Sequence, residues 1–248
     1  MTEKETIKYG LDGLLEIFHN NGELKYRGNY KIGKRDGPWE WFRENGQLHL
    51  KTNYKNGVPH GLWEWFYENG QLEERENYKD DELDGLWESF YENGQLREKI
   101  NYINGKRDGL CETFCFKNNN NPFVLHGPIE IRENYKDGKR NGSWERFYTN
   151  GKLFQKGNIK NGLREGLWER FDKNGNLEET KEYKDGIELS KTQFEYFENG
   201  QLEWRENYKN GKRDGLWEGF HGNGQLWSKK NYKDGTEHGL AEEFYDNG

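Results

Sequence analysis

The sequence repeats with a period of about 24 residues, and this limits the possible folds more than any other feature. Runs such as GLWESF, all but one followed by Asn-Gly, begin 24, 24, 24, 24, 33, 24, 25, 24 and 24 residues apart. The ten copies open at Gly13, Gly37, Gly61, Gly85, Gly109, Gly142, Gly166, Lys191, Gly215 and Gly239. A unit this short cannot bury a core alone, so neighbouring copies must stack into an array.

Each copy has the pattern of a β-hairpin. We number positions from the opening residue as zero, so that Asn-Gly occupies positions eight and nine in most copies. Asn-Gly between aromatic runs predicts a two-residue turn in which both residues have positive φ. A helix is excluded because glycines interrupt every copy after 8 or 9 residues, and a stable helix needs about 12.

The expected fold is therefore all-β, an elongated single-layer antiparallel meander of about ten 24-residue hairpins. A second turn, such as NGKRDG at 104–109, leads from each hairpin to the next. At about 4.8 Å per strand, about 20 strands would form a rod near 90 Å long. No composition shift divides the chain, so we expect a single array over residues 1–248, with an insertion around 117–127 and a final copy cut off at 248.

Composition indicates thin layers around large rings rather than a deep aliphatic core. Only 31% of residues are hydrophobic and 33% are charged, yet 16% are aromatic, which distinguishes the chain from a disordered one. The net charge of −7 argues against nucleic acid as a partner and gives no support for binding to anionic lipid. No apolar run has the length of a signal peptide core or a membrane span, so we expect a soluble cytoplasmic protein.

The predicted turn fixes a register in which the positions of cross-strand partners sum to seventeen. The recurrent Glu at position three then faces position fourteen, which is basic in most copies. The opposed pairs are Glu16–Arg27, Glu40–Lys51, Glu64–Arg75, Glu88–Lys99, Glu145–Lys156 and Glu218–Lys229. Such pairs stabilise a sheet and select its register, so we assign them a structural role.

Strand alternation assigns the side chains to two faces. Positions two, four, six, eleven, thirteen, fifteen and seventeen should share one face, which carries the recurring Trp, Leu and Tyr. Positions one, three, five, twelve, fourteen and sixteen should share the other, which carries Leu, Phe and the Glu–basic pairs. Lys-Arg pairs in the second turns and Glu at the hairpin tips further predict one basic and one acidic edge.

These residues resemble the MORN-type repeats, and the fit is closest to the bacterial and viral variant with a unit like YxNGxLxxxxxYKNGxxxGxWxxF. The resemblance covers roughly residues 9–248. It implies a binding or scaffold module. Many bacterial members carry an antitoxin or immunity-type label, and other MORN proteins are associated with membrane attachment or dimeric scaffolds. This sequence departs from the pattern at the insertion, at Cys111 in a Trp position, and at 191–193.

No pattern in the sequence points to catalysis, a cofactor or a metal. The motifs HExxH, GxSxG and GxxxxGK[ST] do not occur, and His60 and His238 stand at a turn position that is Asp in other copies. On one strand, Cys111 and Cys115 would lie about 13 Å apart, too far for a disulfide. We therefore expect free thiols, no metal or redox site, no cofactor, and no enzyme activity.

Departures between copies are the best indication of a binding site, because recurring residues build the array. Position four is Trp41 and Trp65 in consecutive copies and polar in the copies that follow. With Trp39, Trp63 and Tyr67 they form our candidate partner-binding surface. The alternative is that the extra tryptophans only cover a thin core. Trp204 and Trp227 form a weaker candidate pair, expected on opposite faces.

Two functions follow from these patterns. The first is a non-enzymatic module that binds another protein, with an antitoxin or immunity role as a special case carried only by the resemblance. The second is a structural scaffold that self-associates through its end strands, with a membrane surface as one location for it. A pull-down from native lysate discriminates between them, because a single stoichiometric partner favours the first and recovery of the chain alone favours the second.

Overall fold

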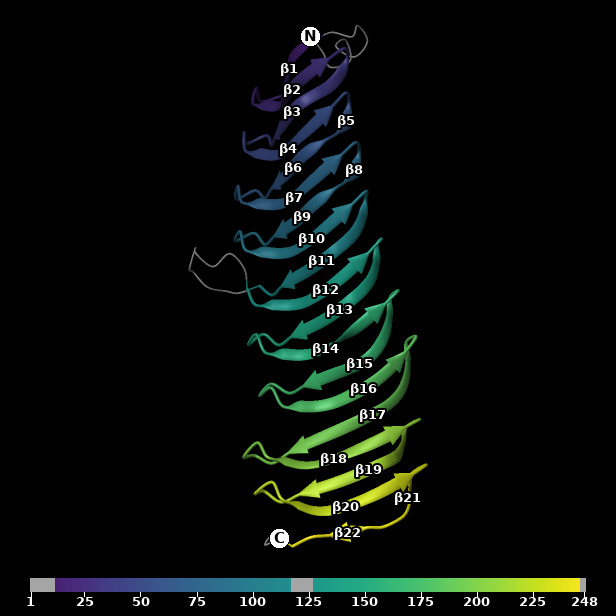
Figure 1. The fold of residues 1–248 in the computed structure, drawn as a ribbon. Coiled ribbons are helices and arrows are strands. Elements are labelled where there is room, and N and C mark those ends of the chain that lie inside the picture. The colour runs from purple at the N-terminus through teal and green to yellow at the C-terminus, as the bar shows by residue number, and fades with distance from the viewer. Residues whose placement is uncertain (1–11, 117–126, 246–248) are drawn as a thin grey trace. The chain divides into compact units, whose positions relative to one another are not determined.

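The computed structural model describes residues 12–116 and 127–245, so the insertion at 117–126 and the last Asn-Gly lie outside the described residues. The described chain forms one open antiparallel sheet of 22 strands without helices, and the strands follow one another in chain order as a meander (Figure 1). The prediction of an all-β hairpin array is confirmed.

The strands group into two compact units, Met1–Ile129 with Tyr135–Gly138, and Glu130–Asn134 with Lys139–Gly248. The strands of the first unit are β1 Gly13–Phe18, β2 Leu24–Lys31, β3 Lys34–Phe42, β4 Leu48–Lys55, β5 Val58–Pro59, β6 Gly61–Phe66, β7 Leu72–Lys79, β8 Glu82–Leu83, β9 Gly85–Phe90, β10 Leu96–Ile103 and β11 Lys106–Phe114. Strand β12, Ile129–Lys136, contributes residues to both units. The remaining strands, in the second unit, are β13 Lys139–Phe147, β14 Leu153–Lys160, β15 Leu163–Phe171, β16 Leu177–Lys184, β17 Ile187–Tyr196, β18 Leu202–Lys209, β19 Lys212–Phe220, β20 Leu226–Lys233, β21 Thr236–Glu237 and β22 Glu242–Glu243.

The Asn-Gly turn inside each hairpin differs from the predicted type. In the first copy the backbone N–H of Gly22 donates to the carbonyl of His19, and the N–H of His19 donates to the carbonyl of Glu23. Of the turn residues only Gly22, at φ 88°, has a left-handed backbone. The prediction of positive φ at both residues was wrong, because Asn21 instead accepts the N–H of Glu23 through its side chain.

A β-bulge corrects the register that this longer turn, with three loop residues in place of two, would otherwise shift. Phe18 lies opposite Leu24, a sum of sixteen, whereas Ile17 lies opposite Tyr26, a sum of seventeen. The extra residue, Lys25 at position twelve, accounts for the difference. The predicted register is confirmed for positions zero to four, although the turn and the bulge produce it together.

The bulge also changes which residues share a face. Leu at position eleven lies opposite Phe at position five, as Leu24 does opposite Phe18, and cross-strand partners share a face. Position twelve lies on the Trp face, since the Trp227 ring centroid is 5.7 Å from that of Trp217. The predicted faces of these two positions were therefore wrong, and so was the placement of Trp227 and Trp204 on opposite faces.

Turns with two left-handed residues do occur, but between hairpins. Asn56 and Gly57 have φ of 54° and 88°, and the equivalent turns repeat this conformation. Where Asp precedes the opening glycine, it supports the turn of the next copy, as Asp36 Oδ1 does by accepting the N–H of Asn56 at 3.1 Å. Asp at this position therefore links neighbouring copies, which explains its recurrence.

The Glu–basic pairs form a ladder that is interrupted at Thr180, which lies opposite Glu169 and Thr192. Arg27 lies opposite Glu16 in its own hairpin and opposite Glu40 in the next. The ion pair goes to Glu40 at 2.7 Å, and the guanidinium also lies 5.8 Å from the ring centroid of Phe42. Similar ion pairs to the following copy join Arg75 to Glu88, Arg132 to Glu145, Lys156 to Glu169 and Arg205 to Glu218. The ladder therefore ties copies together as well as pairing strands within a hairpin.

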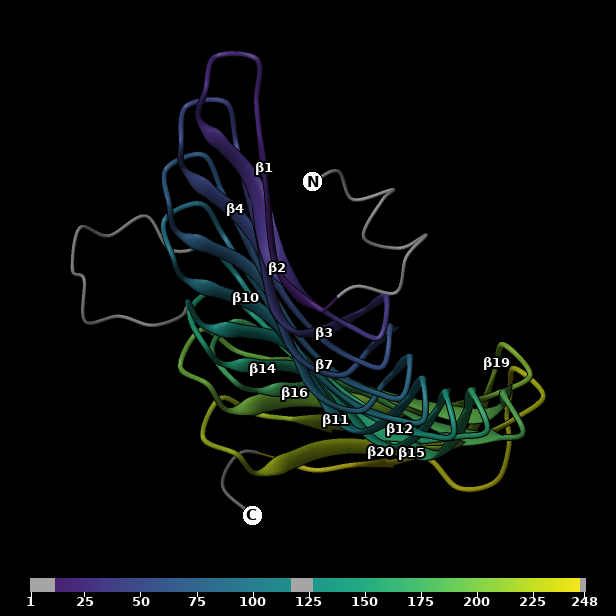
Figure 2. The same cartoon turned by 90° about the horizontal axis from the view of Figure 1, so that it is seen from above.

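The long strands are bent along their length, as Figure 2 shows. Residues 35 and 39 would lie about 13 Å apart on a straight strand. The guanidinium carbon of Arg35 is nevertheless 4.4 Å from the ring centroid of Trp39, and Arg164 lies 4.2 Å from Trp168 in the same way. The bend folds the arginine back over the indole, so the Trp face is the inner face of the bend.

The small core of each unit lies at this bend. Leu15, Tyr30 and Trp39 form one buried cluster, and Ile159, Trp168 and Tyr183 form the other. Each buried indole lies directly over a glycine. A Cβ atom on Gly28 would lie 2.1 Å from Trp39, and one on Gly157 would lie 2.2 Å from Trp168. Glycine is therefore required at these two places for the ring to reach the backbone.

Candidate functional site

A row of partly exposed apolar side chains crosses the inner face of the first unit. It consists of position-four and position-thirteen residues that pair from strand to strand, in the order Ile17, Tyr26, Trp41, Leu50 and Trp65. Beyond Trp65 the row continues with Glu74, Ser89, Glu98 and Thr113. We call the first five residues the apolar row, and it ends abruptly where the polar residues begin.

The recurring tryptophans beside the apolar row are held by the backbone. Trp39 has 0% of its surface exposed, and its indole N–H donates to the carbonyl of Asn29 at 3.2 Å. Trp63 is half-buried, and its N–H donates to the carbonyl of Asn53 at 3.1 Å. Trp168 makes the same bond to Asn158. A ring that both packs and donates to the preceding strand has a structural role, whatever else it contacts.

Trp41 and Trp65 differ from these tryptophans. Both are half-buried, and their rings lie against Trp39 at 5.8 Å and Trp63 at 5.7 Å between centroids. Within the described residues neither indole nitrogen has a hydrogen-bond partner. Each ring thus has a packed side and a solvent side with an unused donor, which are the properties of a side chain at a binding surface.

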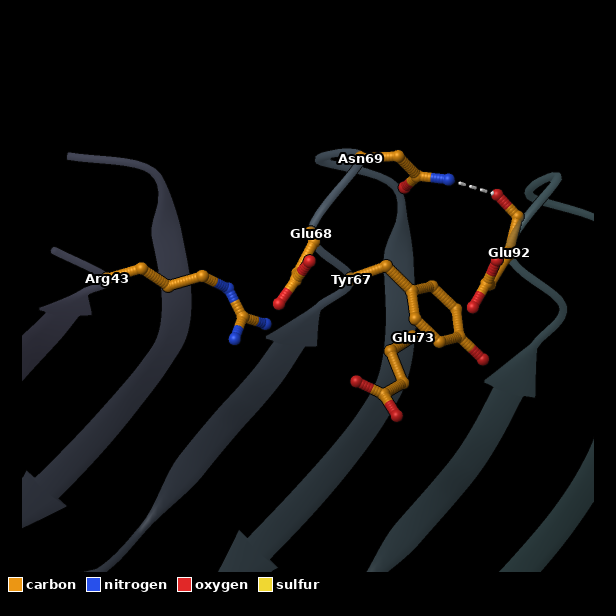
Figure 3. Close-up of a pocket in the computed structure, with 6 residues that line it drawn as sticks. All are labelled: Arg43, Tyr67, Glu68, Asn69, Glu73 and Glu92. Carbon is orange, nitrogen blue, oxygen red and sulfur yellow. Dashed lines mark hydrogen bonds between the residues drawn. The ribbon is translucent and has the colours of Figure 1, made fainter. Parts of the chain in front are cut away.

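Tyr67, the fifth candidate residue, lies at the hairpin end of the same face. It lines a pocket of about 390 Å³ with Arg43, Glu68, Asn69, Glu73 and Glu92 (Figure 3). Burial and the nearby charge of Glu73 raise the pKa of its hydroxyl. That hydroxyl donates to the carbonyl of Phe90 at 2.7 Å.

The bond made by Tyr67 belongs to a series. Arg43 donates to the carbonyl of Phe66 at 2.7 Å, and Tyr91 and Tyr148 donate to the carbonyls of Phe114 and Phe171. Asn69 likewise donates to the carbonyl of Glu92 at 2.6 Å. These position-six and position-eight side chains connect successive hairpins, so the pocket has a frame built from contacts that recur along the chain.

The arginines of the second turns turn inward. Arg35 stacks on Trp39, whereas Arg140 and Arg213 form ion pairs with the buried carboxylates of Glu133 and Glu206, both at 2.7 Å. The prediction of a basic edge was therefore wrong for these arginines, because the bend carries them over the inner face. Arg35 is half-buried, whereas the side chains of Arg140 and Arg213 remain 53% and 47% exposed, and the lysines before them, such as Lys34, are exposed as well.

Sequence reasoning missed one group with unusual electrostatics. Burial raises the pKa of the Glu76 carboxyl to about 7, with a contribution from neighbouring Glu74, while a hydrogen bond with Tyr78 acts in the opposite direction. Only 9% of Glu76 is exposed. The sequence does mark Glu76 as different. Glu133 and Glu206 at the same position are each followed seven residues later by Arg, whereas Glu76 is not.

The cysteines and histidines lie apart from any cluster suited to chemistry. Cys111 is buried in a Trp position, Cys115 is half-buried, and both are free thiols. The His19 ring nitrogen contacts the carbonyl of Phe42, and His60 lies 3.4 Å from the carboxylate of Asp80. Among the described residues, no three His, Cys, Asp or Glu side chains are placed to hold a metal ion.

The described part of the chain has no helix with the length and apolar character needed to cross a bilayer.

Comparison with known proteins identifies the repeat. Eight segments match the family described as MORN repeat variant, namely residues 11–31, 35–56, 59–80, 83–104, 140–161, 164–185, 190–210 and 213–234. No curated protein matches the chain.

Two crystal structures, described as TcdB2–TccC3–Cdc42 and TcdB2–TccC3–TEV, are similar at 10% identity with TM-scores of 0.24 and 0.20. They cover 93% and 94% of this chain, which spans 13% and 15% of theirs. Scores this low carry no argument about this protein.

Proposed function

Because the chain belongs to the MORN repeat variant family, we propose that it is a non-enzymatic repeat module that binds another protein through the apolar row of its first unit. The observation that carries this proposal is the change within one row of equivalent positions. Five consecutive apolar residues, ending at Trp65, give way to Glu74 and then to polar residues. A partly exposed aromatic surface with a polar border is typical of a protein interface.

The contrast between Trp39 and Trp41 supports this assignment. The indole of Trp39 is buried and bonded to the backbone, so the array needs it. The ring of Trp41 lies above it with its nitrogen unbonded within the described residues. A half-buried tryptophan with a rigid neighbour loses little conformational freedom on binding, which is why such residues concentrate binding energy.

The test is capture of a partner from native lysate with wild-type protein and two double variants. Trp41→Ala with Trp65→Ala should weaken capture by about 30-fold, corresponding to about 2 kcal/mol. The matched control is Arg146→Ala with Arg170→Ala, which changes position four in two copies of the second unit and should leave capture unchanged. Thermal melts establish that both variants are folded. Equal capture by the folded tryptophan variant would assign the apolar row to packing alone.

An antitoxin role is a special case of this proposal and has its own test. It rests on the labels of the resembling repeat proteins, and it requires the captured partner to be toxic when produced alone. Co-expression of this chain should then restore growth, and the Trp41→Ala/Trp65→Ala variant should not. A partner without toxicity would leave the general proposal intact and remove the special case.

A structural scaffold remains the second proposed function, because the sheet is open rather than closed into a barrel. Open sheets can add strands from another copy at their ends. Light scattering coupled to size-exclusion chromatography is the direct test, since a concentration-dependent rise in mass with no other protein present would favour the scaffold over the binding module. A membrane location for such a scaffold requires retention on lipid vesicles.

A further inference from the structure

A charge rule links neighbouring copies across the bend. In three copies a charged residue at position fifteen is paired with an opposite charge seven residues later, near the start of the strand that leads into the next copy. Glu133 pairs with Arg140 at 2.7 Å, Lys181 with Glu188 at 3.2 Å, and Glu206 with Arg213 at 2.7 Å. The bend brings the later residue of each pair back over the inner face.

Where position fifteen is glycine, the arginine stacks on a tryptophan instead of forming an ion pair. Where the residue is Gly28 or Gly157, the following indole lies against the backbone and the arginine stacks on it, at 4.4 Å for Arg35 and 4.2 Å for Arg164. These two indoles are only 0% and 3% exposed. The residue seven places after position fifteen is thus often an arginine that either neutralises a carboxylate or covers a ring. We call this place the arginine position.

Glu76 breaks the charge rule. The residue seven positions later is Leu83, so no arginine is available at its arginine position. Glu76 is 9% exposed, its carboxyl hydrogen-bonds with the Tyr78 hydroxyl, and among the described residues it forms no ion pair. The nearest acidic neighbour, Glu74, accepts the indole N–H of Trp87. Two carboxyl groups therefore lie together where two equivalent sites hold a carboxylate and a guanidinium.

Aromatic rings surround this acidic pair. Trp63 lies opposite Glu76 across the strands of its hairpin, and its ring centroid is 5.0 Å from that of Tyr78. The arginine position before Trp63 is Pro59, so two consecutive copies lack the arginine. Pro59, Leu83, Trp63 and Trp87 are all half-buried, so both arginine positions border solvent.

We propose that Glu76, with Glu74, Trp63 and Trp87, forms a receptor for an arginine side chain supplied by the protein partner. The inference rests on the proposed function, since it names one chemical feature of that partner. Charge complementarity favours an arginine as the bound side chain, because this chain places its own arginines against a buried Glu or over a Trp at the equivalent sites. Guanidinium suits both contacts, since it is planar, stacks on indole and pairs with carboxylate.

The receptor adjoins the apolar row. Trp65 lies opposite Glu74, so an arginine at Glu76 would place its neighbouring residues against Trp65 and Leu50. The partner segment is therefore expected to carry an arginine next to apolar side chains. The raised pKa of Glu76 is consistent with this arrangement, because an incoming cation would favour the ionised carboxylate that burial disfavours.

The test uses N-acetyl-arginine-N-methylamide as the probe and the citrulline analogue, which has the same shape without the charge, as its control. Tryptophan fluorescence of the full chain at pH 7.5 and constant ionic strength is followed during titration. We expect a saturable change for the arginine probe, with a dissociation constant of about 1 mM, as is usual for a ligand of this size. The citrulline probe should bind at least tenfold more weakly.

Three variants identify the site. Glu76→Gln removes the carboxylate, and Leu83→Arg supplies the missing arginine from the chain itself, so both should abolish saturation by the probe. Leu189→Arg adds the same charge to the second unit at an exposed residue next to Glu188, which holds the equivalent position there, and should leave binding unchanged. Melts of all variants establish folding, and Leu83→Arg should be at least as stable as wild type because it restores the pair found at Glu206.

Several results would overturn the receptor. These are no saturable response to the arginine probe, equal binding of citrulline, or unchanged binding by folded Leu83→Arg protein. A wild-type dimer that Leu83→Arg disrupts would assign the site to a second copy instead. Failure here is distinguishable from failure of the proposed function, because partner capture would still depend on Trp41 and Trp65 if only the arginine receptor is wrong.

Discussion

Of two neighbouring rows on the inner face, one differs between the two units and the other is the same in both. The row at positions four and thirteen is apolar from Ile17 to Trp65 in the first unit. In the second it reads Arg146, Gln155, Arg170 and Glu179. The neighbouring row keeps a buried tryptophan in both, Trp39 at 0% and Trp168 at 3% exposure. The row enclosed by the bend is constrained by packing, whereas the outer row is free to vary because solvent reaches it.

The largest expected effect tests whether the enclosed row of tryptophans contributes equally to stability in the two units. Trp39→Ala and Trp168→Ala should each reduce the local free energy of unfolding by about 3–5 kcal/mol, the usual loss for a large buried ring. Because repeat arrays are stabilised mainly by neighbouring contacts, hydrogen exchange of the adjoining strands is the appropriate measurement. Trp41→Ala, on the outer row, should cost about 1 kcal/mol because part of its side chain already faces solvent. A loss at Trp41 equal to that at Trp39 would remove the distinction between the rows.

The next effect tests why the enclosed indoles lie so close to the backbone. Gly28→Ala and Gly157→Ala place a Cβ atom within 2.1 and 2.2 Å of an indole, so overpacking should cost about 1–3 kcal/mol in each unit. The measurement is urea denaturation, with the Trp39→Leu background as control. In that background Gly28→Ala should cost less, because the ring it strikes is gone. Strictly additive losses would show that the glycine is needed for another reason.

The smallest expected effect is a difference between the two units in how their stability depends on pH. Glu76 in the first unit lacks an arginine, whereas Glu206 in the second has Arg213. The folded pKa of Glu76, about 7, lies above its ordinary value of 4.5, so the folded state holds more protons between these values. Stability should therefore fall as pH rises from about 4.5 to about 7 and stay level above, with Glu74 and Tyr78 as the facing titratable groups.

Glu76→Gln removes this titration and should raise the melting temperature by a few degrees at pH 8 but not at pH 4.5. Glu206→Gln should instead lower it at pH 8, because Arg213 then loses its buried partner. Melting curves at both pH values check the signs. A gain from Glu206→Gln, or a loss from Glu76→Gln at pH 8, would contradict the assigned difference between the two carboxylates.

The candidate site was predictable only in part. Trp41 and Trp65 are conspicuous in the sequence because position four is otherwise polar in most later copies, and strand alternation places them on the Trp face. Their half-buried state and unused N–H groups depend on how the neighbouring rings pack, which no spacing reports. The role of Tyr67 as a connection to Phe90 was missed, since the residue it bonds lies 23 positions away, in the next copy.

The sequence by itself determined the fold class and the register. A 24-residue period with Asn-Gly turns and opposed Glu–basic pairs excludes helices and allows one hairpin pairing, because a shift of one residue would move every side chain to the other face.

The tertiary structure decided the turn type, the bulge at position twelve and the inward course of Arg35. The first two change the local pairing in ways that cancel in the register, so the sequence pattern cannot detect them. The third arises from a bend that brings residues 35 and 39 together, a contact that depends on the neighbouring strands pairing on both sides.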